Sequence, residues 1–228
     1  MKVSRIRWLI TLISVVAIAP GQVDSGNAEA IRESKNRLID MAKKIELASV
    51  KATADEPPDS AYKRRNRLAF FLHIKELPEP ELFAGIVKDD PSAAVRSMAA
   101  ELVSGSLESD EVVHALHQAL RDVHPAVRTE AASALLRQGY SEEKCVETLS
   151  EVALGKNEQD WDVSGFSEQM DILENPESKK EIAVSWRADA ILALGRASTP
   201  QADRVLETLK ENGVNDRYLS SLVDHALR

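Results

Sequence analysis

The sequence predicts an all-α protein, a right-handed α-α superhelix of about four helix pairs between two terminal helices. Two copies of one unit are visible, Asp90–Arg96 (DPSAAVR) and Asp122–Arg128 (DVHPAVR), and their acids and arginines recur at one spacing. The spacing between these copies is typical of stacked repeats, each of which buries one face against its neighbours. The chain has nine glycines and nine prolines in 228 residues, which leaves long stretches free to form helices.

The residues around each arginine indicate the helical period. In four pairs that precede an apolar stripe, an acid stands six residues before an Arg: Asp59/Arg65, Asp90/Arg96, Asp122/Arg128 and Glu181/Arg187. Positions 3, 4, 6 and 7 after each of these arginines are apolar, which places them on one face of a helix. We expect each acid to cap the first helix of its repeat and each Arg to bridge the turn of the adjoining repeat. These eight residues, the acid–arginine ladder, are therefore interpreted as structural.

The pattern of an acid, five residues, an Arg and then small apolar residues resembles the HEAT-like repeats of α-solenoids. It has the short form that is found in many bacterial proteins and in phycobilin lyases. The resemblance covers residues 59–154 and 181–211. It implies an armadillo-like helical fold, and it says little about function because one fold can host many functions.

Residues 1–30 are expected to be a secretory signal peptide. Three basic residues precede an apolar run from Trp8 to Ala19, which is short for a membrane span of about 20 residues. We expect cleavage between Ala19 and Ala30, and an uncleaved membrane anchor is the alternative. The sequence thus predicts an exported protein, periplasmic or secreted, with no membrane span after signal removal.

The rest of the chain divides into a capping segment and a repeat domain. Residues 31–58 are expected to form an N-terminal capping helix and a linker, because an end repeat needs a neighbour to cover its apolar face. Residues 59–228 form the repeat domain, with the fourth unit resuming at Glu181. The central helices are expected at about 91–104, 109–121, 124–138 and 141–154, and a final helix at 216–228.

An insert at residues 155–180 interrupts the period and contains Trp161 and Phe166 among many acids. Insertions in repeat proteins map to loops, which often lie on the binding face. The sequence leaves two interpretations open, a binding loop and a structural flap held on the core by its aromatic residues.

Composition limits the classes of partner and site. The formal net charge is −8 and no basic stripe is present, so we expect no nucleic-acid partner and favour a basic or mixed protein partner. His114 and His117 could share a metal, but no third ligand stands at a family spacing, so neither a metal nor a cofactor is expected. Cys145, the one cysteine, occupies a predicted core position and is interpreted as a buried apolar residue.

Two functions remain after this search. The first is an exported, non-enzymatic scaffold for protein–protein interaction, with an unknown partner on a concave surface lined by the second helices. The second, implied by the resemblance alone, is an enzyme similar to the HEAT-like bilin lyases; no catalytic motif supports it. The candidate binding residues are the insert aromatics and the polar positions that align on the second helices: Trp161, Phe166, His114, His117, Glu147, Glu207 and Lys210.

Overall fold

The computed structural model describes residues 33, 36–37, 45, 47–52, 60–72, 77–140, 142–167, 175–212, 214 and 216–228. In these residues the structure contains helices and no strand, which confirms the all-α prediction. The predicted signal peptide, Asp59 and most of the predicted N-terminal cap lie outside the described residues. Of the segment 31–58, a short 3-10 helix, η1 (Leu47–Val50), is described and packs on the first helix of the repeats.

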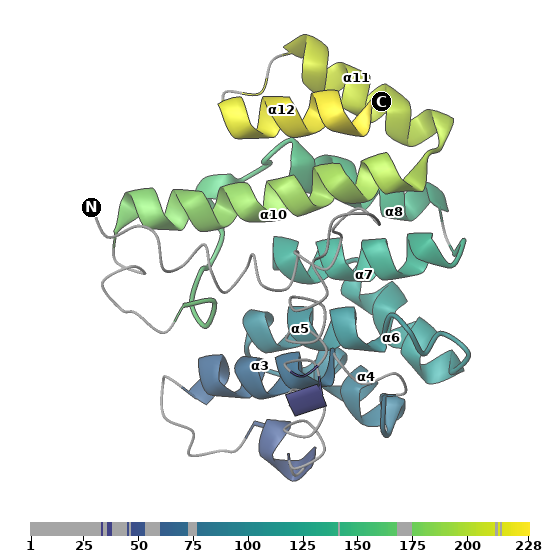
Figure 1. Ribbon diagram of the computed structural model, residues 1–228, viewed down its shortest axis with the longest axis vertical. Helices are drawn as coiled ribbons and strands as arrows, with labels where there is room; N and C mark the ends of the chain where they lie inside the picture. The colour runs from purple at the N-terminus through teal and green to yellow at the C-terminus, as the bar shows by residue number, and fades with distance from the viewer. Residues whose placement is uncertain are drawn as a thin grey trace.

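In the part of the chain that the structure describes, four helix pairs follow one another, and a last helix closes the stack (Figure 1). In the first three pairs the helices are similar in length, whereas the fourth pair begins with a helix of 22 residues. The bounds are α3 (Ser60–Phe71) with α4 (Pro80–Asp89), α5 (Ala93–Val103) with α6 (Asp110–Ala119), α7 (Pro125–Arg137) with α8 (Glu142–Ala153), α10 (Pro176–Ala197) with α11 (Pro200–Asn212), and finally α12 (Arg217–Ala226).

The first helices of the pairs form one continuous row. α3 packs on α5, α5 on α7 and α7 on α10, while α8 packs on both α7 and α10. The stack therefore runs from α3 and α4 at one end to α11 and α12 at the other (Figure 1). α12 packs on α10 and α11 and covers the last repeat, as the sequence predicted for its terminal helix.

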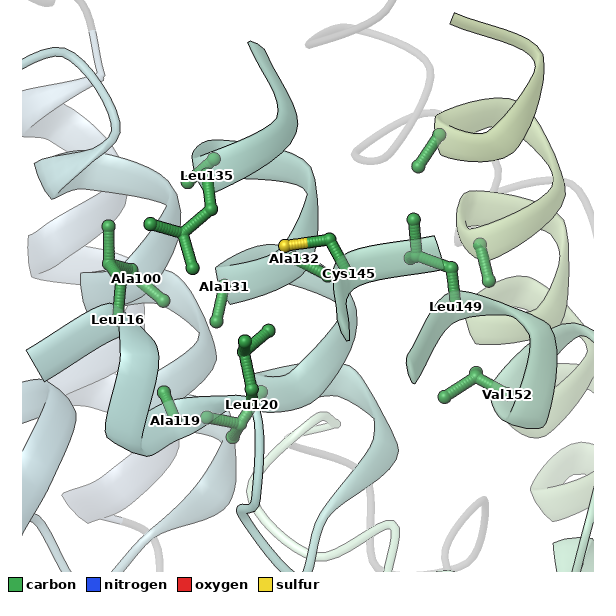
Figure 2. Close-up of a cluster of buried hydrophobic side chains, with 14 of the residues drawn as sticks. Ala100, Leu116, Ala119, Leu120, Ala131, Ala132, Leu135, Cys145, Leu149 and Val152 are labelled. Carbon is green, nitrogen blue, oxygen red and sulfur yellow. The ribbon is translucent and has the colours of Figure 1, made fainter. Parts of the chain in front are cut away.

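The core consists of small and branched apolar side chains at the predicted stripe positions (Figure 2). Ala131, Ala132 and Leu135 of α7 are fully buried between the flanking repeats. Cys145 of α8 lies in the same cluster, and burial raises the pKa of its thiol to about 11, so the thiol stays protonated. This agrees with its interpretation as an apolar core residue.

Helix ends follow local sequence chemistry. α7 ends in a Schellman motif, in which Gly139 has φ +74° and its N–H donates to the carbonyl of Leu136, while the N–H of Tyr140 donates to the carbonyl of Leu135. α10 begins at Pro176, because the Asn175 side chain accepts the N–H of Glu177 and proline suits the first helical turn.

This start corrects the predicted insert at 155–180. The last residues of that segment are helical, and Glu181 lies inside α10 on an exposed surface rather than at its start. Glu181 therefore does not cap this helix. The sequence pattern placed the start too late because it aligned the acid with those of the earlier repeats and gave Asn175 no weight.

Candidate functional site

Two arginine–aspartate pairs, which we call rungs of the acid–arginine ladder, join successive first helices. Arg64 of α3 binds both carboxylate oxygens of Asp90, and these two side chains are only 3 % and 2 % exposed. Arg96 of α5 binds Asp122 in the same way, with Nε–Oδ2 and Nη2–Oδ1 distances of 2.8 and 2.9 Å. A bidentate guanidinium–carboxylate pair fixes direction as well as distance, so each rung sets the register of one repeat on the next.

Each acid also organises the turn before the next helix. Oδ1 of Asp122 accepts the N–H of His124, the N-cap residue of α7, at 2.8 Å, and Asp90 does the same for Ser92 before α5. The acids thus precede the N-cap residue instead of occupying that position. Nη1 of Arg96 donates to the carbonyl of Asp90 in its own repeat at 2.8 Å, which completes the bridge that the sequence predicted.

The ladder arginine of the first repeat is Arg64 and not Arg65, which corrects the prediction. Arg64, Arg96 and Arg128 are evenly spaced at the period of the repeats, and the acid follows its arginine at the same separation in both complete rungs. The pairing of Arg65 with Asp59 placed the arginine one position too late. Arg65 instead lies with its guanidinium 5.7 Å from the centre of the Phe166 ring, and its buried Nε has no hydrogen-bond partner among the described residues.

The third rung lacks its acid. Nη1 of Arg128 donates to the carbonyls of Asp122 and Val123, as Arg96 does in its own repeat, but Leu154 occupies the position where the period would place the next acid. The buried Nε of Arg128 accordingly has no partner among the described residues. Arg187 of α10 uses a different acid, because its Nη1 pairs with Glu158 of the insert at 2.9 Å while its Nε donates to the carbonyl of Ala153.

The described part of the insert lies along the repeats. We call residues 158–166 the strap. At one end Glu158 pairs with Arg187 of α10, and at the other a Cβ on Gly165 would lie 3.1 Å from the hydroxyl of Ser92 and 3.2 Å from Cβ of Ala94, at the start of α5. The strap thus crosses three first helices, α10, α7 and α5.

Aromatic side chains hold the strap in place. Val163 is buried with Ala126 and Trp186 in a small apolar cluster, on which half-buried Trp161 and Phe166 pack. The rings of Trp161 and Phe166 lie 5.9 and 4.8 Å from that of Trp186. These contacts are those of a structural flap, the second of the two interpretations that the sequence left open.

The other predicted binding residues lie on the second helices. His114 is exposed and His117 half-buried on α6, Glu147 is exposed on α8, and Glu207 and Lys210 are exposed on α11. Lys210 pairs with Asp224 of α12 at 2.8 Å. α8 and α11 also border a shallow open hollow, which is lined by Ser150, Leu154, Gln201, Arg204, Val205 and Thr208. Whether these residues bind a partner stays a prediction.

The structure gathers another set of charges that the sequence analysis missed. We call it the charged face: three carboxylates from successive first helices and three nearby guanidinium groups, namely Glu101, Glu130, Asp189, Arg65, Arg137 and Arg196. Within the described part of the chain, no hydrogen bond or ion pair holds the three carboxylates. Glu130 and Asp189 each stand two residues after a ladder arginine, a spacing from which part of this face could have been found.

The carboxylates of the charged face are hard to ionise. Burial raises the pKa of Glu130 well above its usual range, and the charges of Glu101 and Asp189 raise it further. Burial, followed by the charge of Glu101, raises the pKa of Asp189 to about 6. Asp189 is exposed to solvent at the same time. The surrounding helices therefore exclude much of the water near the Asp189 carboxylate but do not cover it. The carboxylate stays accessible to a partner.

Metal ligands and membrane helices were sought in the same residues. Across the described ranges, no three His, Cys, Asp or Glu side chains are grouped so that they could hold a metal ion. No helix in those ranges combines the length and the apolar character that crossing a bilayer requires.

Comparison with known families decides the type of repeat. Residues 79–163, from α4 to the strap, match the family model described as HEAT repeats. Over these residues the chain is similar to HEAT repeats. The matched region contains the complete Arg96–Asp122 rung as well as Glu101 and Glu130 of the charged face. Comparisons of the chain with curated proteins and with solved structures gave no match.

Proposed function

We propose that this protein is an exported, non-enzymatic scaffold that binds a basic segment of a protein partner on the charged face. One observation carries the proposal: three carboxylates from successive repeats lie near one another without an ion pair among the described residues. Glu101 raises the pKa of both Glu130 and Asp189, and Asp189 raises the pKa of Glu130. A repeat stack presents such a row along an extended surface, which suits a partner that lies across several repeats.

Charge complementarity favours a basic partner. A lysine or arginine placed between Glu101, Glu130 and Asp189 would stabilise their ionised forms, so part of the binding free energy would come from relief of their mutual repulsion. Arg137 and Arg196 stand near the C-terminal ends of α7 and α10, where they limit the acidic part of the face. We therefore expect a short basic stretch in the partner instead of a uniformly basic surface.

Two further features support the proposal. The basic start and the apolar run of residues 1–30 favour export, as set out above. HEAT repeats supply a helical scaffold, and two of the three carboxylates, Glu130 and Asp189, occupy the same position after a ladder arginine. Ionisable groups with shifted pKa values cluster at functional sites, which is the physical reason for assigning binding to this face.

Binding to short labelled peptides tests the proposal. Fluorescence anisotropy is measured with the full chain and three peptides of equal length, one rich in Lys and Arg, one neutral and one acidic. We expect the basic peptide to bind and Asp189→Asn to weaken it by about tenfold, the effect of about 1.4 kcal/mol. Glu147→Gln on α8 is the matched control and should leave affinity unchanged.

Two results would overturn this proposal. Equal affinity for all three peptides would remove the charge argument. A loss of binding in Glu147→Gln, with none in Asp189→Asn, would move the binding surface to the second helices, where the sequence analysis had placed it. Capture of a partner from an envelope extract should then follow, and the same pair of variants should rank its affinity in the same order.

A further inference from the structure

One buried histidine lies at the contact between the strap and the repeats. His124, the N-cap residue of α7, is 5 % exposed and lies between the strap and α10. Its ring stacks on Phe166 with centroids 5.1 Å apart, and its edge meets Trp186 at 4.7 Å. Its Nε2 is 2.5 Å from the backbone carbonyl of Asp162. Removing His124 from this position would therefore remove its contacts with Asp162 and Phe166 and weaken the attachment of the strap.

The two hydrogen bonds of His124 define its protonation state. The backbone N–H of Ala126 points at Nδ1 at 3.2 Å, and because an N–H can only donate, Nδ1 carries no proton. Nε2 must then carry the proton and donate it to the carbonyl of Asp162. The neutral Nε2–H form satisfies both partners, whereas protonation would place an N–H at Nδ1 against the N–H of Ala126.

We propose that the strap is a pH-sensitive clamp, held on the HEAT repeats by neutral His124 and released when His124 becomes protonated. Protonation breaks the hydrogen bond that Nδ1 accepts from Ala126 and so weakens the N-terminal cap of α7. The charged ring must then leave its buried position to regain water, and leaving ends its contact with Asp162 as well. Since the strap connects α10 with α7 and α5, its release would allow these repeats to change their relative orientation. This inference goes beyond the proposed binding function and does not depend on it.

Charged groups act on His124 from the turn before α7, from the strap and from α5. Asp122 precedes it in the turn, Asp162 faces it from the strap, and Arg96 approaches from α5; Lys179 of α10 acts on Asp162. Burial is the largest effect and lowers the pKa of His124; the carbonyl of Asp162 and the two aspartates oppose it, and Arg96 adds to it. Phe166 and Trp186 add no charge.

The direction of the shift gives the pH window. The pKa of His124 in the folded protein is lower than the ordinary 6.5 of an unfolded histidine. The unfolded or strap-released form therefore binds the proton more readily. The stabilisation by neutral His124 is complete above about pH 6.5 and is lost progressively as the pH falls towards the lowered pKa.

Global stability is the wrong measurement for this test. The carboxylates of the charged face have raised pKa values, so they favour the folded state as the pH falls, which is the opposite sign. The measurement must report on the strap alone. Hydrogen exchange followed by mass spectrometry, corrected for the intrinsic exchange rate at each pH, resolves peptides that cover residues 158–166 from those of α7.

The experiment uses the full chain and three variants. His124→Asn keeps a side-chain acceptor for the cap but cannot titrate in this range. Gly165→Ala should loosen the strap at every pH, because its φ of +77° is strained for alanine and a Cβ would crowd Ser92 and Ala94. Gln159→Ala, at an exposed strap position, is the matched control.

In the wild type and in Gln159→Ala, we expect strap protection to fall several-fold between about pH 7.5 and 5.5 while the amides of α7 beyond its first turn keep theirs. In His124→Asn the strap should be less protected and its protection independent of pH. The same pH dependence in His124→Asn, or simultaneous loss in strap and α7 core, would overturn the proposal.

Titration of His124 by NMR gives a second and independent result. Because protonation and strap release are linked, Gly165→Ala should raise the pKa of His124 towards that of an exposed histidine. An unchanged pKa in this variant would show that the strap does not sense the charge on His124. This measurement remains decisive even if His124→Asn does not fold.

Discussion

Removal of Asp122 tests directly whether the rungs hold the repeats together. Its carboxylate accepts Nε and Nη2 of Arg96, and Oδ1 also accepts the N–H of His124. Both side chains of the pair are 12 % exposed. In Asp122→Ala the guanidinium of Arg96 would remain between α5 and the next turn with two donors unsatisfied, and the N-cap residue of α7 would lose its acceptor.

The magnitude follows from this geometry. Breaking a buried ion pair by removing one partner costs about 3–5 kcal/mol. The remaining bond from Nη1 of Arg96 to the carbonyl of Asp90 and the partial exposure place Asp122→Ala near the lower end, at about 3 kcal/mol. For a domain of this size each kcal/mol lowers the melting temperature by about 2–4 °C, so a decrease of about 6–12 °C is expected.

Thermal and urea unfolding, followed by far-ultraviolet circular dichroism, measure this loss. Lys156→Gln is the control, because its pair with Glu151 is exposed, with side chains 58 % and 47 % accessible, and should contribute no more than about 1 kcal/mol. A loss in Asp122→Ala as small as that in the control would refute the view that the rungs set the register of the repeats.

Two further outcomes follow from the same contacts. Leu154→Asp should supply the missing acid of the third rung, because Nε of Arg128 would gain a charged acceptor. Urea unfolding should then show a free energy of unfolding higher by about 1–2 kcal/mol. An unchanged urea midpoint would show that the end of α8 directs this side chain elsewhere. Asp189→Asn should stabilise the protein at neutral pH by about 1 kcal/mol, a value discounted for solvent screening. The ionised form of Asp189 is disfavoured by the fold, so this gain should shrink as the pH falls below about 6 and vanish near 3.8; a gain that persists at low pH would exclude the charge as its cause.

The sequence by itself determined the helices and their order. The regular period and the apolar stripe after each arginine are local and repetitive, and burial of one helical face leaves few alternatives to a stack of pairs. The ends of α5, α6, α7 and α8 agree with the expected ranges to within a few residues. The even arginine spacing also contained the correct ladder residue, Arg64, although the pairing of Asp59 with Arg65 obscured it.

Only the tertiary structure decided how residues far apart in the chain meet. The insert showed aromatic residues and acids without saying what they contact, because no period links Phe166 with His124 or Glu158 with Arg187. The charged face likewise depends on which turns of successive first helices come side by side. Such contacts are set by the packing angle and offset of whole helices, which result from the sum of many core contacts and have no local signal in the sequence.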